Sequence, residues 1–348
     1  MNIELTKNIS IGKNKRPIIV AEISSNHNSK KSLFLDHIVQ AKKAGADMIK
    51  IQTYEPGDIT LNERSKKFLI TKGIWKGKYL WDLYQKAHTP FSWHDAAFLL
   101  GKKLKIPIFS TPFSIRAVDF LKRFNPIIYK VSSFEITDFA LINHIAKIKK
   151  PIIISTGLSN YKEIDNAIKI ITKYHRKIII LYCISGYPTP EIESNILTIK
   201  TFQKRYKNFH IGISDHTNDI NSSLAATSLG ATIIEKHFKI SNKIKSLDSS
   251  FSINFNQLKE LKLRSQKIFL SLGSSRLKMK KAEKNLLNLR RSIFAAKNIK
   301  KNVKIMKDKI LVKRPKIGIG AENFFKIIGK HAKKNIKKND PIFKFNIK

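Results

Sequence analysis

The sequence predicts an α/β fold, a (β/α)8 TIM barrel followed by a small β-rich C-terminal domain. Short Ile- and Val-rich runs alternate eight times with amphipathic stretches over the first two-thirds of the chain. Near-continuous apolar runs of this kind are typical of parallel strands that are buried on both faces. Eight such units in a row favour a closed barrel over an open doubly wound sheet, which is the main alternative.

The elements follow in chain order. The predicted strands are Ile18–Ile23, Met48–Gln52, Pro107–Thr111, Ile127–Val131, Ile152–Ser155, Ile178–Tyr182, Ile211–Ser214 and Thr232–Glu235. The predicted helices are Lys30–Ala44, Trp93–Leu104, Ile115–Phe124, Asp138–Ile148, Tyr161–Lys173, Ile220–Leu229 and a last one near Phe255–Leu270. Ser114, Thr137 and Asn160 stand where an N-cap residue would begin three of them.

The composition and the hydrophobic pattern of the sequence change after Gly273. We therefore predict a first domain at 1–273, a linker at 274–290 and a small domain at 291–348. The linker is polar and lysine-rich and could also form an exposed helix. Ile293–Ala296, Lys309–Lys313 and Pro341–Phe345 are short strand-like pieces without helical periodicity. Because domains of this size are marginally stable alone, we expect the last one to dock on a barrel of its own or another subunit.

The charge of the chain is extreme, with 67 Lys and Arg against 25 Asp and Glu and a net charge of +42. A nucleic-acid-binding protein is the alternative of a different class. The lysines are spread along the whole chain, however, and aromatic residues do not alternate with them. We therefore attribute the charge to biased composition and expect no nucleic-acid partner, although the charge can steer anionic substrates.

The beginning of the chain has no apolar core of a signal peptide, and no apolar run approaches the ~18 residues of a membrane span. Cys183 is the only cysteine, so there is no intrachain disulfide. A cytoplasmic protein is expected.

Two histidines, His216 and His237, lie at or just past the C-terminal ends of two apolar runs. If these runs are neighbouring parallel strands, both imidazoles project into one cavity, with backbones about 5 Å apart. Two imidazoles are a common start for a divalent metal site, with water or substrate oxygen completing it. The alternative is a pair of unrelated strand-end histidines.

Every predicted strand ends in polar residues, and in a TIM barrel these positions form the active site. They are Glu22, Lys50, Gln52, Ser110, Thr111, Lys130, Ser132, Ser133, Ser155, Thr156, Ser185, Asp215, His216, Glu235, Lys236 and His237. Lys50 and Lys130 lie within otherwise apolar strand sequences, where burial of their charge is costly unless an anion pairs with them. Two lysines and several hydroxyls predict a cradle for phosphate and carboxylate, facing a carbonyl polarised by the metal.

The order of these motifs resembles the sialic acid synthase family. The motifs are Ala21-Glu-Ile-Ser-Ser-Asn-His-Asn28, Lys50-Ile-Gln-Thr53, Ser110-Thr-Pro-Phe113, Tyr129-Lys-Val-Ser-Ser-Phe-Glu135, Ile154-Ser-Thr-Gly157, Tyr187-Pro-Thr-Pro190, Ser214-Asp-His-Thr217 and Glu235-Lys-His-Phe238. Arg290-Arg-Ser292 and Val312-Lys-Arg-Pro315 resemble the antifreeze-like (SAF) domain that closes these proteins. The resemblance implies condensation of phosphoenolpyruvate with an N-acetylated sugar aldehyde and release of phosphate.

Within the family, Leu80–Tyr84, Thr89–His94 and Ser133–Asp138 resemble the pseudaminic acid branch. That branch implies 2,4-diacetamido-2,4,6-trideoxy-L-altrose as the acceptor sugar. The N-acetylneuraminate and legionaminic acid branches, with other N-acetylated hexoses, remain as alternatives.

The resemblance also implies roles for individual residues. His216 and His237 would hold a divalent metal, manganese by expectation, with magnesium or cobalt as alternatives. Phosphoenolpyruvate would be bound by Lys50, Gln52, Thr111, Lys130, Ser133, Ser155 and Ser185. Glu22 would orient or deprotonate the attacking water, and the sugar would meet Glu135, Tyr187, Asp248 and Arg314. In the family pattern Arg314 comes from the SAF domain of the partner subunit, which implies a homodimer.

The chain departs from the family pattern on the acceptor side. Ser246-Leu247 replaces the usual Gly-Pro before Asp248, Lys316 replaces a glycine, and the loop 239–245 lacks the usual acidic and glycine residues. Two other readings compete with the synthase. One is a class I aldolase that forms a Schiff base on Lys130, and the other is a non-catalytic sugar-binding relative.

Overall fold

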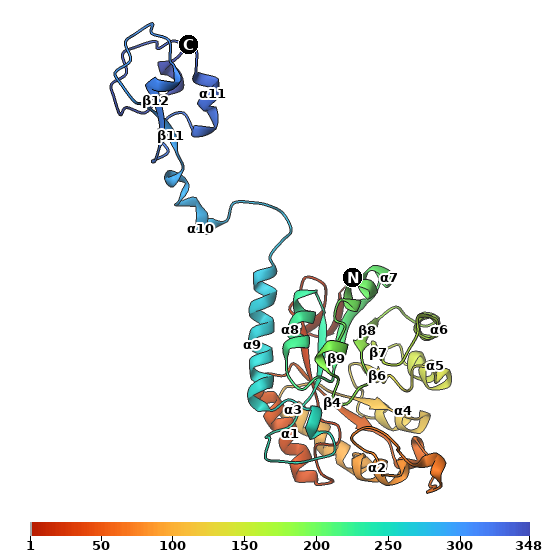
Figure 1. Ribbon diagram of the computed structural model, residues 1–348. Coiled ribbons are helices and arrows are strands. Elements are labelled where there is room, and N and C mark those ends of the chain that lie inside the picture. The colour runs from red at the N-terminus through yellow and green to blue at the C-terminus, as the bar shows by residue number, and fades with distance from the viewer. Residues whose placement is uncertain (1) are drawn as a thin grey trace. The chain divides into compact units, whose positions relative to one another are not determined.

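The computed structural model describes residues 2–348 and divides into two compact units, one up to Gly273 and one from Ser274 to Lys348. Figure 1 shows the larger unit as a group of strands surrounded by helices.

Eight parallel strands form the sheet of the first unit, in the order β5-β4-β3-β10-β9-β8-β7-β6. They are β3 Ile18–Glu22, β4 Met48–Thr53, β5 Ile108–Pro112, β6 Tyr129–Val131, β7 Ile152–Ser155, β8 Ile178–Cys183, β9 His210–Asp215 and β10 Ile233–His237. The first and last strands of this order, β5 and β6, also lie against each other. The sheet therefore closes into a (β/α)8 barrel, and the open-sheet alternative is wrong.

Helices follow the strands and cover the outside of the barrel (Figure 1). They are α1 Lys31–Ala44, α2 Leu80–Ala87, α3 His94–Lys103, α4 Ile115–Lys122, α5 Phe139–Lys147, α6 Tyr161–Thr172, α7 Thr198–Arg205, α8 Asn221–Ser228 and α9 Phe255–Leu272. Polar caps fix several of their starts. Asn160 and Glu163 form a capping box on α6, and Asn254 and Gln257 form one on α9.

Alternation along the strands sorts the core into two layers. Outward side chains such as Ile49 and Ile154 pack against the helices in one large cluster. Inward side chains such as Val20 and Met48 form a separate cluster inside the barrel. Ile3 and Ile11, from the hairpin β1 Ile3–Thr6 and β2 Ile9–Ile11, join this inner cluster. The inner cluster uses the early part of most strands, which leaves the carboxyl ends to polar side chains.

The second unit is built around an antiparallel hairpin, β11 Ser292–Ala295 and β12 Ile310–Lys313, with the short helices α10 Lys281–Lys284 and α11 Phe324–Ile327. Its core is a cluster of isoleucines that includes Ile293, Ile305 and Ile342. Residues 274–291 are almost entirely exposed.

The eight predicted strands and seven predicted helices of the barrel are confirmed within two residues at each end. Two details were wrong. Thr137 is not the N-cap of α5, because Asp138 takes that place and its side chain accepts a hydrogen bond from the Leu141 amide. Pro341–Phe345 is not a strand, since only Pro341 forms a bridge, with Phe294, before a short 3-10 turn. The helices α2 and α7 and the β1–β2 hairpin were not predicted.

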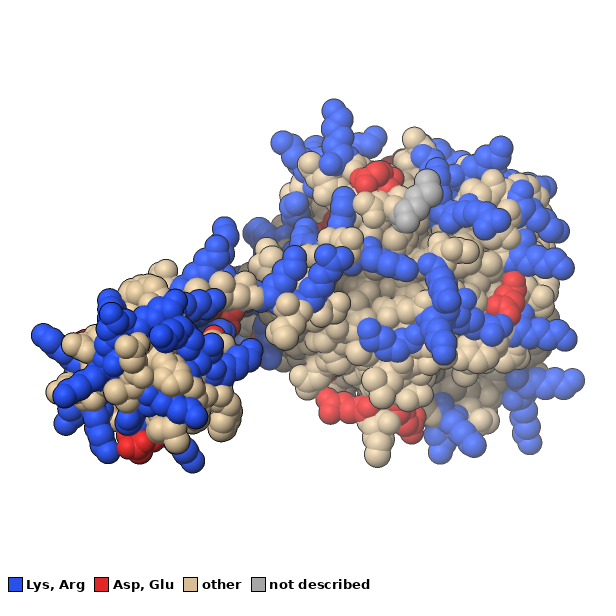
Figure 2. Space-filling model, turned by 90° about the horizontal axis from the view of Figure 1, so that it is seen from above, with Lys and Arg blue, Asp and Glu red and all other residues tan. Residues whose placement is uncertain are grey.

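Lysine and arginine side chains are distributed over the face of both units seen in Figure 2, with acidic side chains in a few isolated places. The view shows no single basic stripe of the kind that nucleic-acid-binding surfaces carry. Among residues 2–348, no helix combines the length and apolarity needed to cross a membrane.

Candidate active site

Four ionisable side chains meet inside the carboxyl end of the barrel. Lys50 Nζ lies 2.8 Å from Glu22 Oε2 and 3.2 Å from Glu235 Oε1. Lys130 Nζ lies 3.2 Å from the same Glu235 oxygen. All four side chains are at most 5% exposed. The anions that the two buried lysines need are thus supplied by the chain itself.

The environment shifts the pKa values of the two glutamates in opposite directions, and likewise those of the two lysines. Burial and the neighbouring Glu235 charge raise the pKa of Glu22 to about 7, although Lys50 opposes the shift. Burial would also raise the pKa of Glu235, but Lys130 and Lys50 outweigh it and hold that pKa well below its ordinary value. Burial lowers the pKa of Lys130, whereas for Lys50 the two carboxylates overcome burial and raise the pKa. Glu22 is therefore the member of the cluster that exchanges a proton near neutral pH.

Neutral polar side chains surround the charged cluster. Lys50 Nζ donates to Thr111 Oγ1 at 3.4 Å. Gln52 Nε2 lies 3.5 Å from Glu22 Oε1 and 3.0 Å from Ser24 Oγ. These residues come from β3, β4 and β5, which pair in register, so the sheet itself brings them together.

Serines from three further strands gather beside the lysines. Gly157 N–H donates to Ser133 Oγ at 3.0 Å. A Cβ at Gly157 would clash with Ser185 Oγ and would lie 2.9 Å from Ser133 Oγ, so only glycine lets these hydroxyls approach. Ser155 Oγ, on β7, is buried without a hydrogen-bond partner among residues 2–348. These serine hydroxyls can donate hydrogen bonds to an oxyanion.

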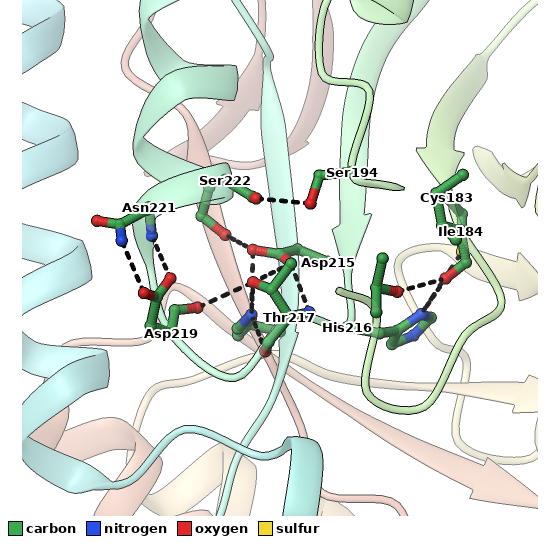
Figure 3. A network of polar contacts seen from close by, with 12 residues as sticks. Cys183, Ile184, Ser194, Asp215, His216, Thr217, Asp219, Asn221 and Ser222 are labelled. Carbon is green, nitrogen blue, oxygen red and sulfur yellow. Dashed lines mark hydrogen bonds and ion pairs between the residues drawn. The ribbon is translucent and has the colours of Figure 1, made fainter. Parts of the chain in front are cut away.

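The two histidines lie side by side, with ring centroids 5.3 Å apart. Their strands β9 and β10 are hydrogen-bonded neighbours. His216 Nδ1 lies 2.8 Å from the Ile184 carbonyl oxygen, and Figure 3 shows the ring turned toward Ile184. A carbonyl only accepts, so Nδ1 carries the proton and Nε2 is left with a lone pair in the neutral ring. This is the arrangement of many metal-bound histidines.

The polar atoms of the histidine pair are available to a divalent metal. His237 Nδ1 is buried without a hydrogen-bond partner among the described residues and lies 3.9 Å from Asp248 Oδ2. Burial and the neighbouring His216 hold the pKa of His237 well below its ordinary value, which keeps the ring neutral. Burial also lowers the pKa of His216, but Cys183 and the Ile184 carbonyl raise it by more.

The donor set therefore fits a metal held by two imidazoles, but it does not enclose one. Within residues 2–348, no three His, Cys, Asp or Glu side chains are grouped closely enough to form a full ligand set. The remaining positions would have to be filled by water or substrate oxygen, as in an open catalytic site.

An aromatic wall covers the histidine pair. It is made of Tyr187, Phe251 and Trp75. The Tyr187 ring lies 4.4 Å from His216 and the Phe251 ring 4.9 Å from His237, between centroids. Trp75 packs on Tyr187 at 5.7 Å and donates from Nε1 to the Leu247 carbonyl at 3.3 Å. The wall keeps water from one side of the pair and strengthens electrostatic interactions there.

Asp248 is held in place although the family's Gly-Pro is missing. Its Oδ2 accepts from the Ser25 amide at 3.2 Å, and its carbonyl accepts from Ser252 Oγ at 2.7 Å. Burial raises the pKa of Asp248 above its ordinary value. With Trp75 bound to the preceding residue, Leu247, this loop is anchored from three sides.

Glu135 lies at the rim and forms a hydrogen bond with Ser132. Burial raises its pKa to about 7. Burial and the charge of Glu135 raise the pKa of Tyr84, so this tyrosine of α2 stays a neutral hydrogen-bonding group. Both side chains can form hydrogen bonds with a polar ligand at this rim.

Arg314 is the one predicted site residue in the second unit. It is exposed, makes no hydrogen bond or ion pair with residues 2–348, and lines a surface hollow with Arg290, Arg291 and Glu322.

Sequence reasoning named Glu235 among the polar strand ends but gave it no role, and it missed Trp75 and Phe251 as site residues. Glu235 had a signal, because it precedes His237 by two positions and strand alternation puts both on one face. Trp75 and Phe251 belong to long loops, where no periodicity reveals which way a side chain points.

Residues 37–277 match the model of the NeuB family. The chain is 37% identical over 330 residues to a pseudaminic acid synthase of Campylobacter jejuni, with 94% of this chain and 96% of the relative covered. It is 33% identical to an N,N'-diacetyllegionaminic acid synthase of the same species, with 94% and 99% covered. The chain belongs to the NeuB family, and the resemblance to sialic acid synthases is confirmed.

Solved structures agree with this assignment. A sialic acid synthetase of Leptospira borgpetersenii superposes with a TM-score of 0.73 at 29% identity, covering 82% of this chain and 95% of that one. A spore coat polysaccharide protein of Chromobacterium violaceum superposes with a TM-score of 0.76 at 22% identity, covering 96% and 100%. The second likeness concerns the fold alone.

Proposed function

We propose that this protein is a pseudaminic acid synthase. It condenses phosphoenolpyruvate with 2,4-diacetamido-2,4,6-trideoxy-L-altrose and water, giving pseudaminic acid and phosphate. The observation that carries the reaction class is the pairing of a lysine-carboxylate cluster with two histidines at one end of the barrel. The branch is supported by the higher identity to pseudaminic acid synthases than to legionaminic acid synthases.

In this proposal phosphoenolpyruvate lies over the charged cluster. Lys50 and Lys130 bind its phosphate and carboxylate, and Thr111, Ser133, Ser155 and Ser185 add hydroxyl donors, with Gln52 at the edge toward Glu22. The lysines lie within 3.2 Å of carboxylates in the free protein, so the substrate shares them with Glu22 and Glu235. Charge-assisted hydrogen bonds of this kind are the strong ones.

The open-chain sugar lies on the other side, toward the aromatic wall. His216 and His237 would hold a divalent metal, manganese by expectation, which when bound polarises the aldehyde carbonyl. Tyr187, Asp248 and Glu135 border the same space and would contact the sugar hydroxyls and acetamido groups.

Carbon–carbon bond formation then joins C3 of phosphoenolpyruvate to the aldehyde carbon, whose oxygen takes up a proton. C2 is left electron-poor, and water adds there while Glu22 takes the proton from the water. The C2–O bond to phosphate breaks as the new hydroxyl becomes the ketone, and its proton leaves with the phosphate. A pKa of about 7 suits Glu22 for accepting that proton at neutral pH.

Phosphate release from phosphoenolpyruvate with manganese tests the proposal, comparing the altrose acceptor with N-acetylmannosamine, each with a chelator control. Chelator-sensitive release with the altrose sugar alone is the expected result. Release with N-acetylmannosamine instead would move the protein to the neuraminate branch, and no release with either sugar would refute the proposal.

The second unit enters the proposal as an SAF domain of a homodimer, with Arg314 contacting an N-acetyl group in the partner's barrel. The support is the family resemblance and the exposed guanidinium of Arg314, which has no ion-pair partner among residues 2–348. Arg314→Ala should raise the KM of the sugar and leave that of phosphoenolpyruvate unchanged. An unchanged sugar KM would end the shared-site proposal.

A further inference from the structure

The strands that carry the two histidines are joined by a buried ion pair on the other side of the sheet. Lys236 Nζ lies 3.1 Å from Asp215 Oδ2, and the two side chains are 0% and 1% exposed. Asp215 immediately precedes His216, and Lys236 immediately precedes His237. Because side chains alternate along a strand, the ion pair points out toward the helices while the histidines point in.

This ion pair stands at the last paired position between the two strands. The ladder of β9 and β10 runs through Ile213, Ser214 and Asp215, and its last partners are Lys236 and Asp215. His216 lies beyond that position. His237 is held on its other side, where it pairs with Glu22 of β3. The spacing of the two imidazoles therefore depends on what holds the end of β9 to β10.

Lys236 also reaches past the end of the ladder. Its Nζ donates to the Thr217 carbonyl at 2.6 Å and lies 3.0 Å from Thr217 Oγ1. Asp215 Oδ1 accepts from the Thr217 amide at 2.9 Å and from Thr217 Oγ1 at 2.8 Å, and Ser223 of α8 donates to Asp215 Oδ2 at 2.5 Å. The residues before and after His216 are thus both bound to the residue before His237.

Figure 3 shows the consequence: Asp215 and Thr217 lie together on one side, and His216 extends to the other side toward Ile184. A buried ion pair adds little net stability compared with well-packed apolar residues, so its use here is not explained by folding energy. Its geometry instead constrains the backbone on both sides of one imidazole.

We propose that the Asp215–Lys236 ion pair is a positioning device that sets the distance between His216 and His237. This inference rests on the proposed function, because a fixed distance between the imidazoles matters most if they share a metal and the acceptor aldehyde. Asp215 and Lys236 touch neither and act through the backbone of their neighbours.

The test replaces both members, Asp215→Asn with Lys236→Met, so that no unpaired charge is left buried. Manganese affinity is measured by calorimetry and by the electron paramagnetic resonance of free Mn²⁺, and kcat and both KM values are measured beside it. We expect manganese affinity to fall about 10-fold or more, as for other residues that orient metal ligands, and kcat to fall. The KM of phosphoenolpyruvate should stay within about twofold of the wild-type value, which is a much smaller change than the expected loss of manganese affinity.

The matched control is Lys262→Met. Lys262 Nζ lies 2.6 Å from Asp47 Oδ2, and Asp47 keeps Arg16 as a second partner at 2.9 Å. This ion pair is at the amino end of β4, away from the histidines. Lys262→Met should lower thermal stability without changing manganese affinity or kcat.

A folded double variant with unchanged manganese affinity and unchanged kcat would overturn the inference. If the double variant does not fold, Thr217→Val decides the question by the same readouts, since it removes only the hydroxyl shared by the pair. A wild-type protein that binds no manganese would refute the metal in the proposed function, and the positioning role would then stand or fall on kcat alone.

Discussion

Glu22→Gln is the substitution that separates the chemistry of the site from its architecture. The two side chains have the same shape, so Lys50 keeps a hydrogen-bond acceptor at the position now 2.8 Å from Nζ and keeps Glu235 at 3.2 Å. What is lost is the ability to take a proton. Removing a general base lowers kcat by about 10²- to 10⁴-fold.

The pH dependence gives a second measure of the same change. At a pKa of about 7 before phosphoenolpyruvate binds, Glu22 is only partly deprotonated below neutrality, so kcat/KM for phosphoenolpyruvate should rise with pH through a midpoint near 7. Glu22→Gln should lose that rise. Glu135→Gln is the matched control, because burial also raises the pKa of Glu135 to about 7 but the proposal places this side chain against the sugar and not against the water. It should raise the sugar KM and keep the rise in kcat/KM for phosphoenolpyruvate.

The free energy of unfolding should change with pH in the opposite direction, falling as the pH rises. Because burial raises the folded-state pKa of Glu22 from 4.5 to about 7, the folded protein binds this proton more tightly than the unfolded chain. The resulting stabilisation is complete below about pH 4.5 and is lost as the pH rises to about 7, on the order of 3 kcal/mol. Thermal unfolding at pH 5 and pH 8 measures this effect. Between these two pH values, Glu22→Gln should lose less stability than the wild-type protein. A variant with wild-type kcat, or one that keeps the rise near pH 7, would refute the reasoning.

Three further predictions concern the acceptor side and the substrate. His237→Ala should lower manganese-dependent turnover by about 10²-fold or more. The variant should stay folded, because His237 Nδ1 makes no hydrogen bond with residues 2–348. A folded variant with full, chelator-sensitive activity would contradict the assignment of His237 as a metal ligand. Trp75→Phe loses the Nε1 hydrogen bond to Leu247, a contact of about 1 kcal/mol, so the sugar KM should rise about fivefold while the phosphoenolpyruvate KM is unchanged. Phosphoenolpyruvate binding should take up protons at pH 7–8, since its charge raises the pKa of Glu22, and calorimetry in buffers of different ionisation enthalpy would contradict this if the heats agree.

The barrel could be predicted from the sequence because its strands are buried on both faces and are therefore rich in Ile and Val. The elements that were missed lack such a signal. The helix α7 is Thr198–Arg205, an eight-residue segment with only Ile199 and Phe202 buried. The hairpin β1–β2 is short and largely half-exposed, and within its two strands only Ile3 and Ile11 are buried.

The site could be predicted in its members but not in its pairing. Strand alternation and the lysines at positions 50 and 130 indicated a buried anion site, and the structure places both there. Whether the anion belongs to a substrate or to the chain could not be predicted, because that depends on which strands are neighbours. Only the strand order brings Glu235 of β10 within reach of lysines from β4 and β6.

The pairing explains how two buried lysines can exist in a folded protein that has not yet bound its substrate. With Glu22 and Glu235 both ionised, the cluster of two lysines and two carboxylates has no net charge, so it can be buried in the barrel. Glu22 is the weaker acid, with a pKa of about 7, while Lys50 and Lys130 hold Glu235 ionised. The phosphate and carboxylate of the arriving substrate can replace the charge of Glu22 at Lys50. The Glu22 carboxylate then accepts a proton more readily. The group that balances Lys50 in the free protein thereby becomes the base that the proposed addition of water requires.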